Sequence, residues 1–236
     1  MTKHNITPSR RRVLHSALCT LQSILLIACT GESEAPPPTL ARFDFEDGST
    51  EGLVPKNAEN WRVVDDDGSK VYTLLEPGEF GEIRAPSAWS VIADFPVGSF
   101  EFTGRMKCHT EPETLARDML VIFHYQDPTH FYYVHFSASS DGLHNVIGLV
   151  NGADRVKINR EAPGETVYRL TDMEWHDFKV TYDSETGEIQ AFMDEMTTPI
   201  ITASDSTLPH VLVGVGSFDD IGSFDDLILS GEVVTH

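Results

Sequence analysis

The stretch VIFHYQDPTHFYYVHF, residues 121–136, decides the fold class of this 236-residue chain. Aromatic and β-branched residues fill its two halves, and the segment YQDPTH between them, residues 125–130, has the composition of a turn. Two such halves around a short turn are typical of a pair of antiparallel strands. We therefore predict a hairpin whose strands cover residues 119–125 and 131–137.

Short runs of the same kind recur along the rest of the chain, separated by Gly, Pro, Asp and Asn. A second hairpin turn is predicted at DSETG, residues 183–187, and the single candidate helix is 111–118, with Pro112 near its start. About fourteen short strands at this spacing predict an all-β chain folded as an antiparallel β-sandwich. The other predicted strands are 41–46, 61–64, 71–75, 82–85, 91–95, 99–107, 145–150, 155–159, 175–182, 188–193, 211–218 and 224–229.

The first 28 residues have the composition of an export signal. Residues 9–14, SRRRVL, place a twin arginine before an apolar stretch, in the order of a bacterial Tat signal. The stretch ends in LIAC, residues 26–29, which resembles a lipobox and implies cleavage before Cys29 with lipid attached to its sulfur. The alternatives are an ordinary signal peptide or a transmembrane anchor. The apolar stretch is shorter than the ~20 residues that span a bilayer, which disfavours the anchor.

We accordingly divide the chain into a lipoprotein signal at 1–28, a lipid-anchored Pro-rich linker at 29–39 and one domain at 40–236. The linker is expected to be a stiff, polar connection between the lipid and the domain. After cleavage Cys108 is the only cysteine left besides the lipidated one, so no intramolecular disulfide is expected and the domain must rely on its core. The expected location is the bacterial cell envelope, facing the periplasm or the cell surface.

The charge of the chain excludes two classes of partner. The whole sequence holds 17 basic and 37 acidic residues, and the predicted signal removes four basic residues and no acidic one, which leaves a formal net charge of −24. Nucleic acid and anionic membrane surfaces are poor partners for such a surface. Membrane contact is therefore expected through the lipid alone, and no feature of the sequence sets an oligomeric state.

Several segments, in order over residues 41–232, resemble the concanavalin A-like jelly-roll superfamily. They are FDFEDG (43–48), GSFEFTGRMK (98–107), the hairpin quoted above, EWHDFKVTYDSETGEIQAFMD (174–194) and VGVGSFDDIGSFDDLILSGE (213–232). Within the superfamily the chain is most similar to 3-keto-disaccharide hydrolase-like and laminin G-like domains of exported bacterial proteins. The resemblance implies a polysaccharide or oligosaccharide partner, although the fold hosts lectins, binding modules, hydrolases and lyases alike.

Residues suited to sugars occur at alternating positions of several predicted strands, and we expect them to gather on one sheet face. Aromatic rings stack on the C–H faces of sugars, whereas Arg and Lys bind hydroxyls or carboxylates. The alternative is a solvated face whose bases balance nearby acids. The candidate glycan-binding residues are Arg105, Lys107, His124, Tyr133, His135, Arg155, Lys157 and, as a stacking platform, Trp89.

Evidence for catalysis is weaker. The chain lacks the Glu-x-Asp-x-x-Glu run with which family 16 glycoside hydrolases on this fold supply two carboxylates, so that mechanism is excluded. Residue types for proton abstraction from a uronate are present, but no catalytic residue can be assigned. We predict a surface-anchored glycan-binding lipoprotein. The alternative is a glycoside hydrolase or polysaccharide lyase acting on 3-keto-glycosides or uronic-acid glycans.

The doubled motif GSFDDIGSFDDL, residues 216–227, is the candidate metal-binding pattern. Its first Asp pair fits a turn, whereas the second falls in a predicted strand, where a carboxylate is costly unless exposed, hydrogen-bonded or bound to a cation. One hypothesis is a structural Ca²⁺ between the terminal strands, and the other is hydrogen bonding of Asp225 to backbone amides. The proposed calcium ligands are Asp44, Glu46, Asp225 and Asp226.

The lipobox assignment predicts that Cys29→Ser releases the protein from the membrane fraction, because the sulfur that carries the lipid is lost. Cell fractionation with immunoblotting measures this, and Cys19→Ser, within the same signal, is the matched control that stays in the membrane. A Cys29→Ser protein that remains membrane-bound contradicts the assignment.

Overall fold

A computed structural model of the chain describes Met1 and residues 37–159, 170–209 and 212–234. From Pro36 onwards the chain belongs to one structural unit. The predicted signal, Cys29 and most of the linker lie outside the described residues. Within the described residues no helix has both the length and the apolar character needed to cross a membrane.

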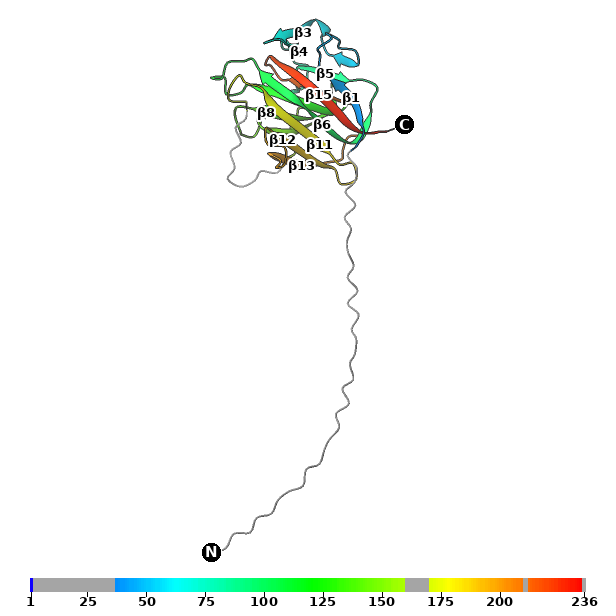
Figure 1. Ribbon diagram of the computed structural model, residues 1–236, viewed down its shortest axis with the longest axis vertical. Helices are drawn as coiled ribbons and strands as arrows, with labels where there is room; N and C mark the ends of the chain where they lie inside the picture. Colours follow the sequence, from blue (N-terminus) through cyan, green and yellow to red (C-terminus); the bar gives the residue numbers. More distant parts are fainter. Residues whose placement is uncertain (2–36, 160–169, 210–211, 235–236) are drawn as a thin grey trace. The chain divides into compact units, whose positions relative to one another are not determined.

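Two antiparallel sheets make up the domain (Figure 1). The first, sheet A, has the spatial order β13 (Ile201–Ser204), β12 (Glu188–Met193), β11 (His176–Tyr182), β6 (Val97–Cys108), β15 (Gly222–Val233), β4 (Ser69–Leu74) and β3 (Trp61–Asp66), with β1 (Thr39–Phe43) also paired to β15. The second, sheet B, has the order β10 (Val156–Lys157), β9 (Val146–Asn151), β8 (His130–Ser137), β7 (Asp118–Asp127), β14 (Leu212–Ser217), β5 (Ala88–Ile92) and β2 (Leu53–Pro55).

The hairpin predicted for residues 119–137 is confirmed as β7 and β8, paired from Asp118 opposite Ser137 to Asp127 opposite His130. Asp127 closes the turn, because its Oδ1 accepts a hydrogen bond of 2.7 Å from the backbone N–H of Thr129. The register slips once between Phe123 and Asp127, at a bulge in which His124 has a φ of 48°. The predicted turn at 183–187 is also confirmed, since Gly187 N–H donates to the Asp183 carbonyl.

Strand alternation buries both faces of sheet B. On β7, Met119, Val121 and Phe123 join the core between the two sheets, whereas Leu120 and Ile122 join a second apolar cluster on the outer face of sheet B. The remaining members of this second cluster are Ala85, Trp89, Val91, Phe131, Tyr133, Val146, Val150 and Phe218, with Ile83, Tyr125 and Leu212 packed against it. The segment between β4 and β5 thus supplies part of a cover over sheet B.

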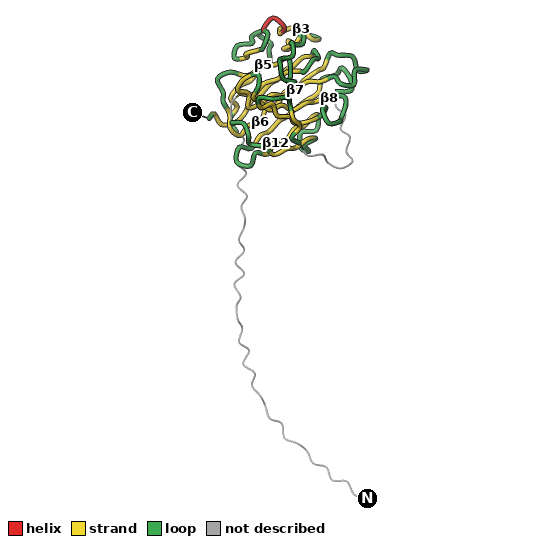
Figure 2. Tube along the Cα trace, turned by 180° about the vertical axis from the view of Figure 1, so that it is seen from behind, coloured by secondary structure: helices red, strands yellow, loops and turns green. Residues whose placement is uncertain are grey.

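The sequence predictions fail in four places. Residues 82–85 form no strand, since they belong to the cover over sheet B, where Arg84 N–H donates to Asp154 at 2.8 Å instead of to a ladder. Residues 111–118 contain separate turns, closed by Thr114 and Arg117 N–H groups, and no helix. Strands β2 and β13 were not predicted. Figure 2 shows the short 3-10 helix Ala58–Asn60 beside β3, the single helix among the described residues.

The free thiol of Cys108 lies in the core at the end of β6. Burial raises its pKa, because the charged thiolate is disfavoured away from water. In the described part of the chain the domain is therefore held by packing and hydrogen bonds, with an unreactive thiol.

The packing of Tyr133 across Gly148 predicts that Gly148→Ala destabilises the domain. A Cβ at Gly148 would lie 2.2 Å from Tyr133 Cζ, so the ring must move out of its packed position. We expect a loss of about 1–3 kcal/mol in the free energy of unfolding, measured by denaturant titration. Gly142→Ala, where an added Cβ meets nothing within 4 Å, is the control, and equal stability of the two variants contradicts the prediction.

Candidate functional site

The predicted glycan-binding residues do not share one face. Arg105 and Lys107 belong to β6 of sheet A, whereas Tyr133 and His135 belong to β8 of sheet B. The expectation of a common face is therefore wrong, because alternation sorts residues within a strand and does not show which sheet the strand joins. Two separate groups replace the predicted one.

The group on sheet A surrounds Trp175. The guanidinium carbon of Arg105 lies 4.8 Å from the indole centroid, and Nζ of Lys107 lies 5.8 Å from it. Asp66 accepts hydrogen bonds from Trp175 Nε1 at 3.0 Å and from Lys107 Nζ at 3.2 Å. Arg105 in turn forms an ion pair with the buried carboxylate of Asp225. Each base has an acid beside it, which is the pattern of a balanced sheet face.

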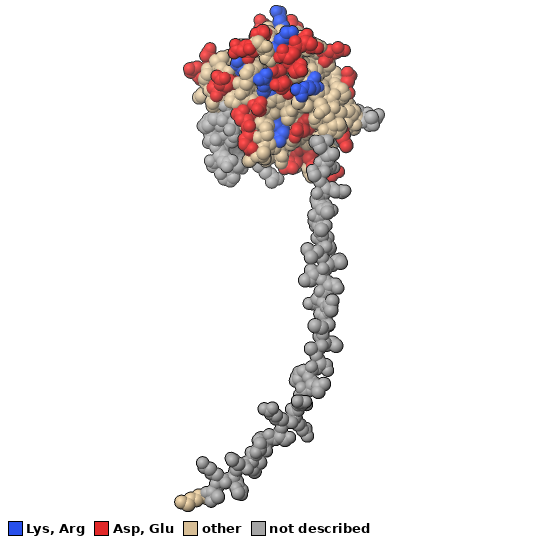
Figure 3. Space-filling model, in the orientation of Figure 1, with Lys and Arg blue, Asp and Glu red and all other residues tan. Residues whose placement is uncertain are grey.

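Basic side chains also lie among acidic ones on the rest of this side of the molecule. Figure 3 shows the side of the molecule on which β15, β6 and β11 are labelled in Figure 1, and there the Lys and Arg side chains are scattered among more numerous Asp and Glu. No extended basic area is visible on this side.

The four predicted calcium ligands are not brought together as a carboxylate cluster among the described residues. Asp225 pairs with Arg105 and accepts the backbone N–H of Asp226 at 2.8 Å, while Asp226 Oδ2 lies 3.4 Å from Arg105 Nε. Glu46 Oε1 accepts hydrogen bonds from Ser69 Oγ and Lys70 N–H, and Asp44 Oδ1 accepts the Glu46 N–H. Arg105 thus neutralises the carboxylates of Asp225 and Asp226, the second Asp pair of the doubled motif. A backbone amide also donates to Asp225, as the hypothesis of backbone hydrogen bonding predicted.

The group on sheet B is centred on the ring of Phe218, which follows β14. The guanidinium carbon of Arg155 lies 4.1 Å from the ring centroid and that of Arg84 lies 5.5 Å from it. The rings of Tyr133 and His135 approach Phe218 edge-on, with centroids at 5.4 and 5.1 Å. We call these five residues the Phe218 cluster. It unites Tyr133, His135 and Arg155 of the predicted set with Phe218 and Arg84, which the sequence did not single out.

Backbone hydrogen bonds set the spacing of the two arginines. Arg155 N–H donates to the carbonyl of Arg84 at 3.0 Å, and Arg84 N–H donates to Asp154 Oδ1. The side chain of Arg84 is 43% exposed, and among the described residues its one ion pair, 3.7 Å long, is with Asp219. Burial raises the pKa of Tyr133, which keeps its hydroxyl protonated.

Buried Asp118, at the start of β7, anchors this end of sheet B. Its Oδ1 accepts hydrogen bonds from Ser217 Oγ and Phe218 N–H, both at 2.9 Å, and its Oδ2 lies 3.1 Å from His135 Nε2. The other ring nitrogen of His135 lies 2.9 Å from the Leu143 carbonyl, which can only accept, so Nδ1 carries a proton.

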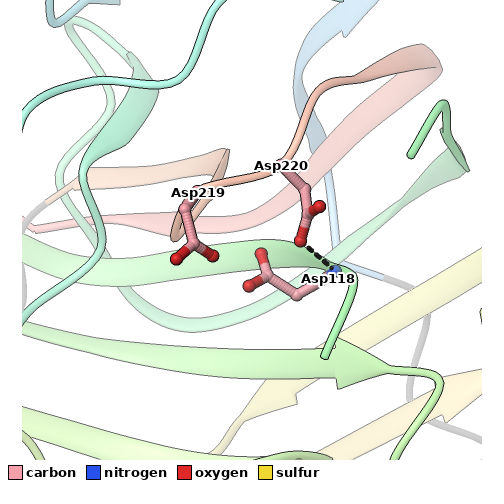
Figure 4. A group of neighbouring side chains, drawn as sticks. All are labelled: Asp118, Asp219 and Asp220. Atoms are coloured by element: carbon pink, nitrogen blue, oxygen red, sulfur yellow. Dashed lines mark hydrogen bonds between the residues drawn. The ribbon is translucent and has the colours of Figure 1, made fainter. Parts of the chain in front are cut away.

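The turn between β14 and β15 adds two carboxylates beside Asp118 (Figure 4). Asp219 is exposed, whereas Asp220 is buried and accepts the backbone N–H of Asp118 at 2.8 Å. Burial, and then repulsion from Asp118, raise the pKa of Asp220 to about 6. The prediction of turn residues is confirmed for their position, but it did not anticipate that Asp220 is buried against a third carboxylate.

The other predicted residues have packing roles or lie at the sheet edge. His124 lies between the sheets, where its ring meets that of Tyr182 at 4.3 Å. Trp89 is buried on the outer face of sheet B, with Lys56 Nζ 4.5 Å from its ring centroid, so the ring is no open platform. Lys157 belongs to the edge strand β10.

His176, the residue after Trp175, is hydrogen-bonded to two carboxylates. His176 Nδ1 lies 3.0 Å from Asp194 Oδ2, and Nε2 lies 3.0 Å from Asp172 Oδ1. Burial alone would lower the pKa of His176, but the hydrogen bonds with Asp194 and Asp172 outweigh it and raise the pKa. The doubly protonated ring can donate to both carboxylates at once.

The raised pKa of His176 predicts a specific dependence of stability on pH. Its contribution is fully present below the unfolded-state pKa of about 6.5 and is lost as the pH rises through the higher folded-state value. The melting temperature of the wild-type protein should therefore fall more between pH 6 and pH 8.5 than that of His176→Gln, as measured by calorimetry. Asp194→Asn, which removes one of the two acceptors, should give an intermediate fall. Identical pH profiles for His176→Gln and wild type contradict this.

Comparisons with known proteins identify the fold. No family model and no curated protein matches the sequence. Among solved structures, carbohydrate binding module CBM66 from Bacillus subtilis has a TM-score of 0.51 at 13% identity, over 76% of this chain and 96% of that one. Peanut lectin has 0.55 at 12% identity, over 84% and 100%. A protein of unknown function with a galectin-like fold from Bacillus subtilis has 0.52 at 13%, over 85% and 99%. The chain has the concanavalin A-like jelly-roll fold that its segments predicted.

Proposed function

We propose that the domain binds a polysaccharide or oligosaccharide at the Phe218 cluster. The observation that carries the proposal is the convergence of Arg84 and Arg155, from two different segments, on the ring of Phe218. A guanidinium group presents planar, paired N–H donors that match a carboxylate or two neighbouring hydroxyls. Two of them fixed side by side form a ready receptor for an oxygen-rich ligand.

The charge of these arginines is available to a ligand. Arg105 on sheet A is committed to the buried carboxylate of Asp225, whereas the 3.7 Å pair of Arg84 with Asp219 joins side chains that are 43% and 53% exposed. Such exposed pairs contribute little and exchange readily. The ring of Phe80, which is exposed, lies 3.8 Å from the Arg84 guanidinium carbon and offers an apolar face for a sugar. A uronic-acid glycan fits this combination better than a neutral one.

The fold and the sequence support the same class of ligand. Two of the similar structures are described as a carbohydrate binding module and a lectin, at identities at which only the fold is shared. The predicted lipid on Cys29 would hold the domain at the bacterial envelope, where extracellular polysaccharide is met. We therefore propose that the protein is a surface-anchored glycan-binding lipoprotein.

Burial favours binding over the alternative of glycan cleavage. Tyr133 and His135, which have the residue types of a lyase proton-transfer pair, are each 1% exposed. A general base must come within hydrogen-bond reach of the proton that it removes. Both side chains instead serve as the packed floor beneath the two arginines.

The proposal predicts that the wild-type chain is retarded in affinity gels containing a uronate polymer such as polygalacturonate, and less in gels containing a neutral glucan. Arg84→Ala and Arg155→Ala should each weaken the apparent affinity by roughly tenfold or more, because a charge-assisted hydrogen-bond pair is lost. Trp175→Ala, which removes the aromatic ring of the opposite sheet, is the matched control and should bind as wild type.

Two results would overturn the proposal. One is retardation that survives both arginine substitutions and is lost in Trp175→Ala, which would move the site to sheet A. The other is release of unsaturated or shortened glycan by the wild-type chain, followed by ultraviolet absorbance and chromatography, which would make the protein a lyase or hydrolase.

A further inference from the structure

Three carboxylates lie next to the Phe218 cluster. Asp118 opens β7, and Asp219 and Asp220 lie in the turn between β14 and β15. One oxygen from each lies within 4.8 Å of the others, and Figure 4 shows the three side chains converging. Within the described ranges no other group of three His, Cys, Asp or Glu side chains meets this spacing.

Of these three carboxylates, only Asp219 lies within ion-pair distance of an arginine or lysine among the described residues. Asp118 is 1% and Asp220 is 7% exposed, so both have lost most of their hydration. Arg84 reaches only the exposed Asp219, at 3.7 Å, and among the described residues Asp220 has no ion-pair partner. Buried carboxylates that lie close together are stabilised by a shared proton, a basic group or a metal ion.

His135 supplies an independent observation that points into this cluster. Its side chain is 2% exposed, and its Nδ1–H donates to the Leu143 carbonyl, which leaves Nε2 facing Asp118 Oδ2 at 3.1 Å. Nε2 is buried and has no hydrogen-bond partner among the described residues. A buried histidine that donates one N–H to a backbone carbonyl and leaves its other nitrogen without a hydrogen bond, beside a carboxylate, has the arrangement found around protein-bound metals.

The surrounding donors orient the carboxylates and leave oxygens for an ion. Ser217 Oγ and Phe218 N–H donate hydrogen bonds to Asp118 Oδ1, and Asp118 N–H donates one to Asp220 Oδ2. Oδ2 of Asp118 and the oxygens of Asp219 accept no hydrogen bond from the described residues, and they face the shared space. A set dominated by carboxylate oxygens suits hard divalent cations such as Ca²⁺ rather than thiophilic metals.

We propose that Asp118, Asp219 and Asp220 bind one hard divalent cation, with His135 at the edge of the site. The ion would tie the β14–β15 turn to the start of β7, and bound water can complete its coordination. This inference does not depend on the proposed glycan function, since it concerns binding of the ion in the absence of any sugar.

The test is a titration of the EDTA-treated, dialysed full-length chain with Ca²⁺ alone. Isothermal calorimetry should give one site per chain, and the melting temperature should rise by about 5–10 °C once Ca²⁺ exceeds its dissociation constant about a hundredfold. Asp219→Asn, at an exposed position, should fold normally and lose both the binding heat and the thermal shift. Asp226→Asn, the equivalent exposed position in the second half of the doubled motif, is the matched control and should keep both.

Three outcomes overturn the proposal. Wild-type protein that shows neither heat nor a thermal shift with Ca²⁺, Mg²⁺ or Mn²⁺ up to 10 mM would leave a shared proton as the link between the carboxylates. Unchanged Ca²⁺ binding in Asp219→Asn would place the ion elsewhere. Equal losses in Asp219→Asn and Asp226→Asn would show that the effect comes from the net charge.

Discussion

The buried carboxylate of Asp118 is the constraint on which this end of the domain depends. It accepts hydrogen bonds from Ser217 and Phe218, faces His135, and its own backbone N–H donates to Asp220. The side chain and backbone N–H of this one residue thereby join the start of β7 to the end of β14, to β8 and to the turn that leads into β15. The ring of Phe218 takes its position from this junction, and the guanidinium groups of Arg84 and Arg155 lie against the ring. The hydrogen bonds that satisfy the buried carboxyl group of Asp118 therefore organise the neighbouring aromatic and basic groups.

The sequence was most informative where the pattern is local. Alternation of large apolar residues predicted β7 and β8 and the turn between them, because that signal is contained in sixteen consecutive residues. Strands β2 and β13 are short and were missed, since three or four residues show little periodicity. Residues 82–85 resemble a strand in composition, yet they cover the outer face of sheet B, a tertiary role that no local pattern reveals.

The candidate site shows the same limit more sharply. Tyr133, His135 and Arg155 could be singled out by residue type, but Arg105 and Lys107 were grouped with them because the pairing of strands into sheets is not local information. The doubled acidic motif is a second case. Both halves read alike in sequence, and the difference arises from partners distant along the chain: Arg105 beside Asp225, and Asp118 beside Asp220. A two-residue turn signal could not foretell that a third carboxylate would approach from β7.

The buried thiol of Cys108 bears on how the domain reaches its folded state. A domain that closes around an unreactive thiol, and that builds its core from two packed sheets, needs no oxidant to reach its final state. Its folding should proceed equally in a reducing or an oxidising compartment.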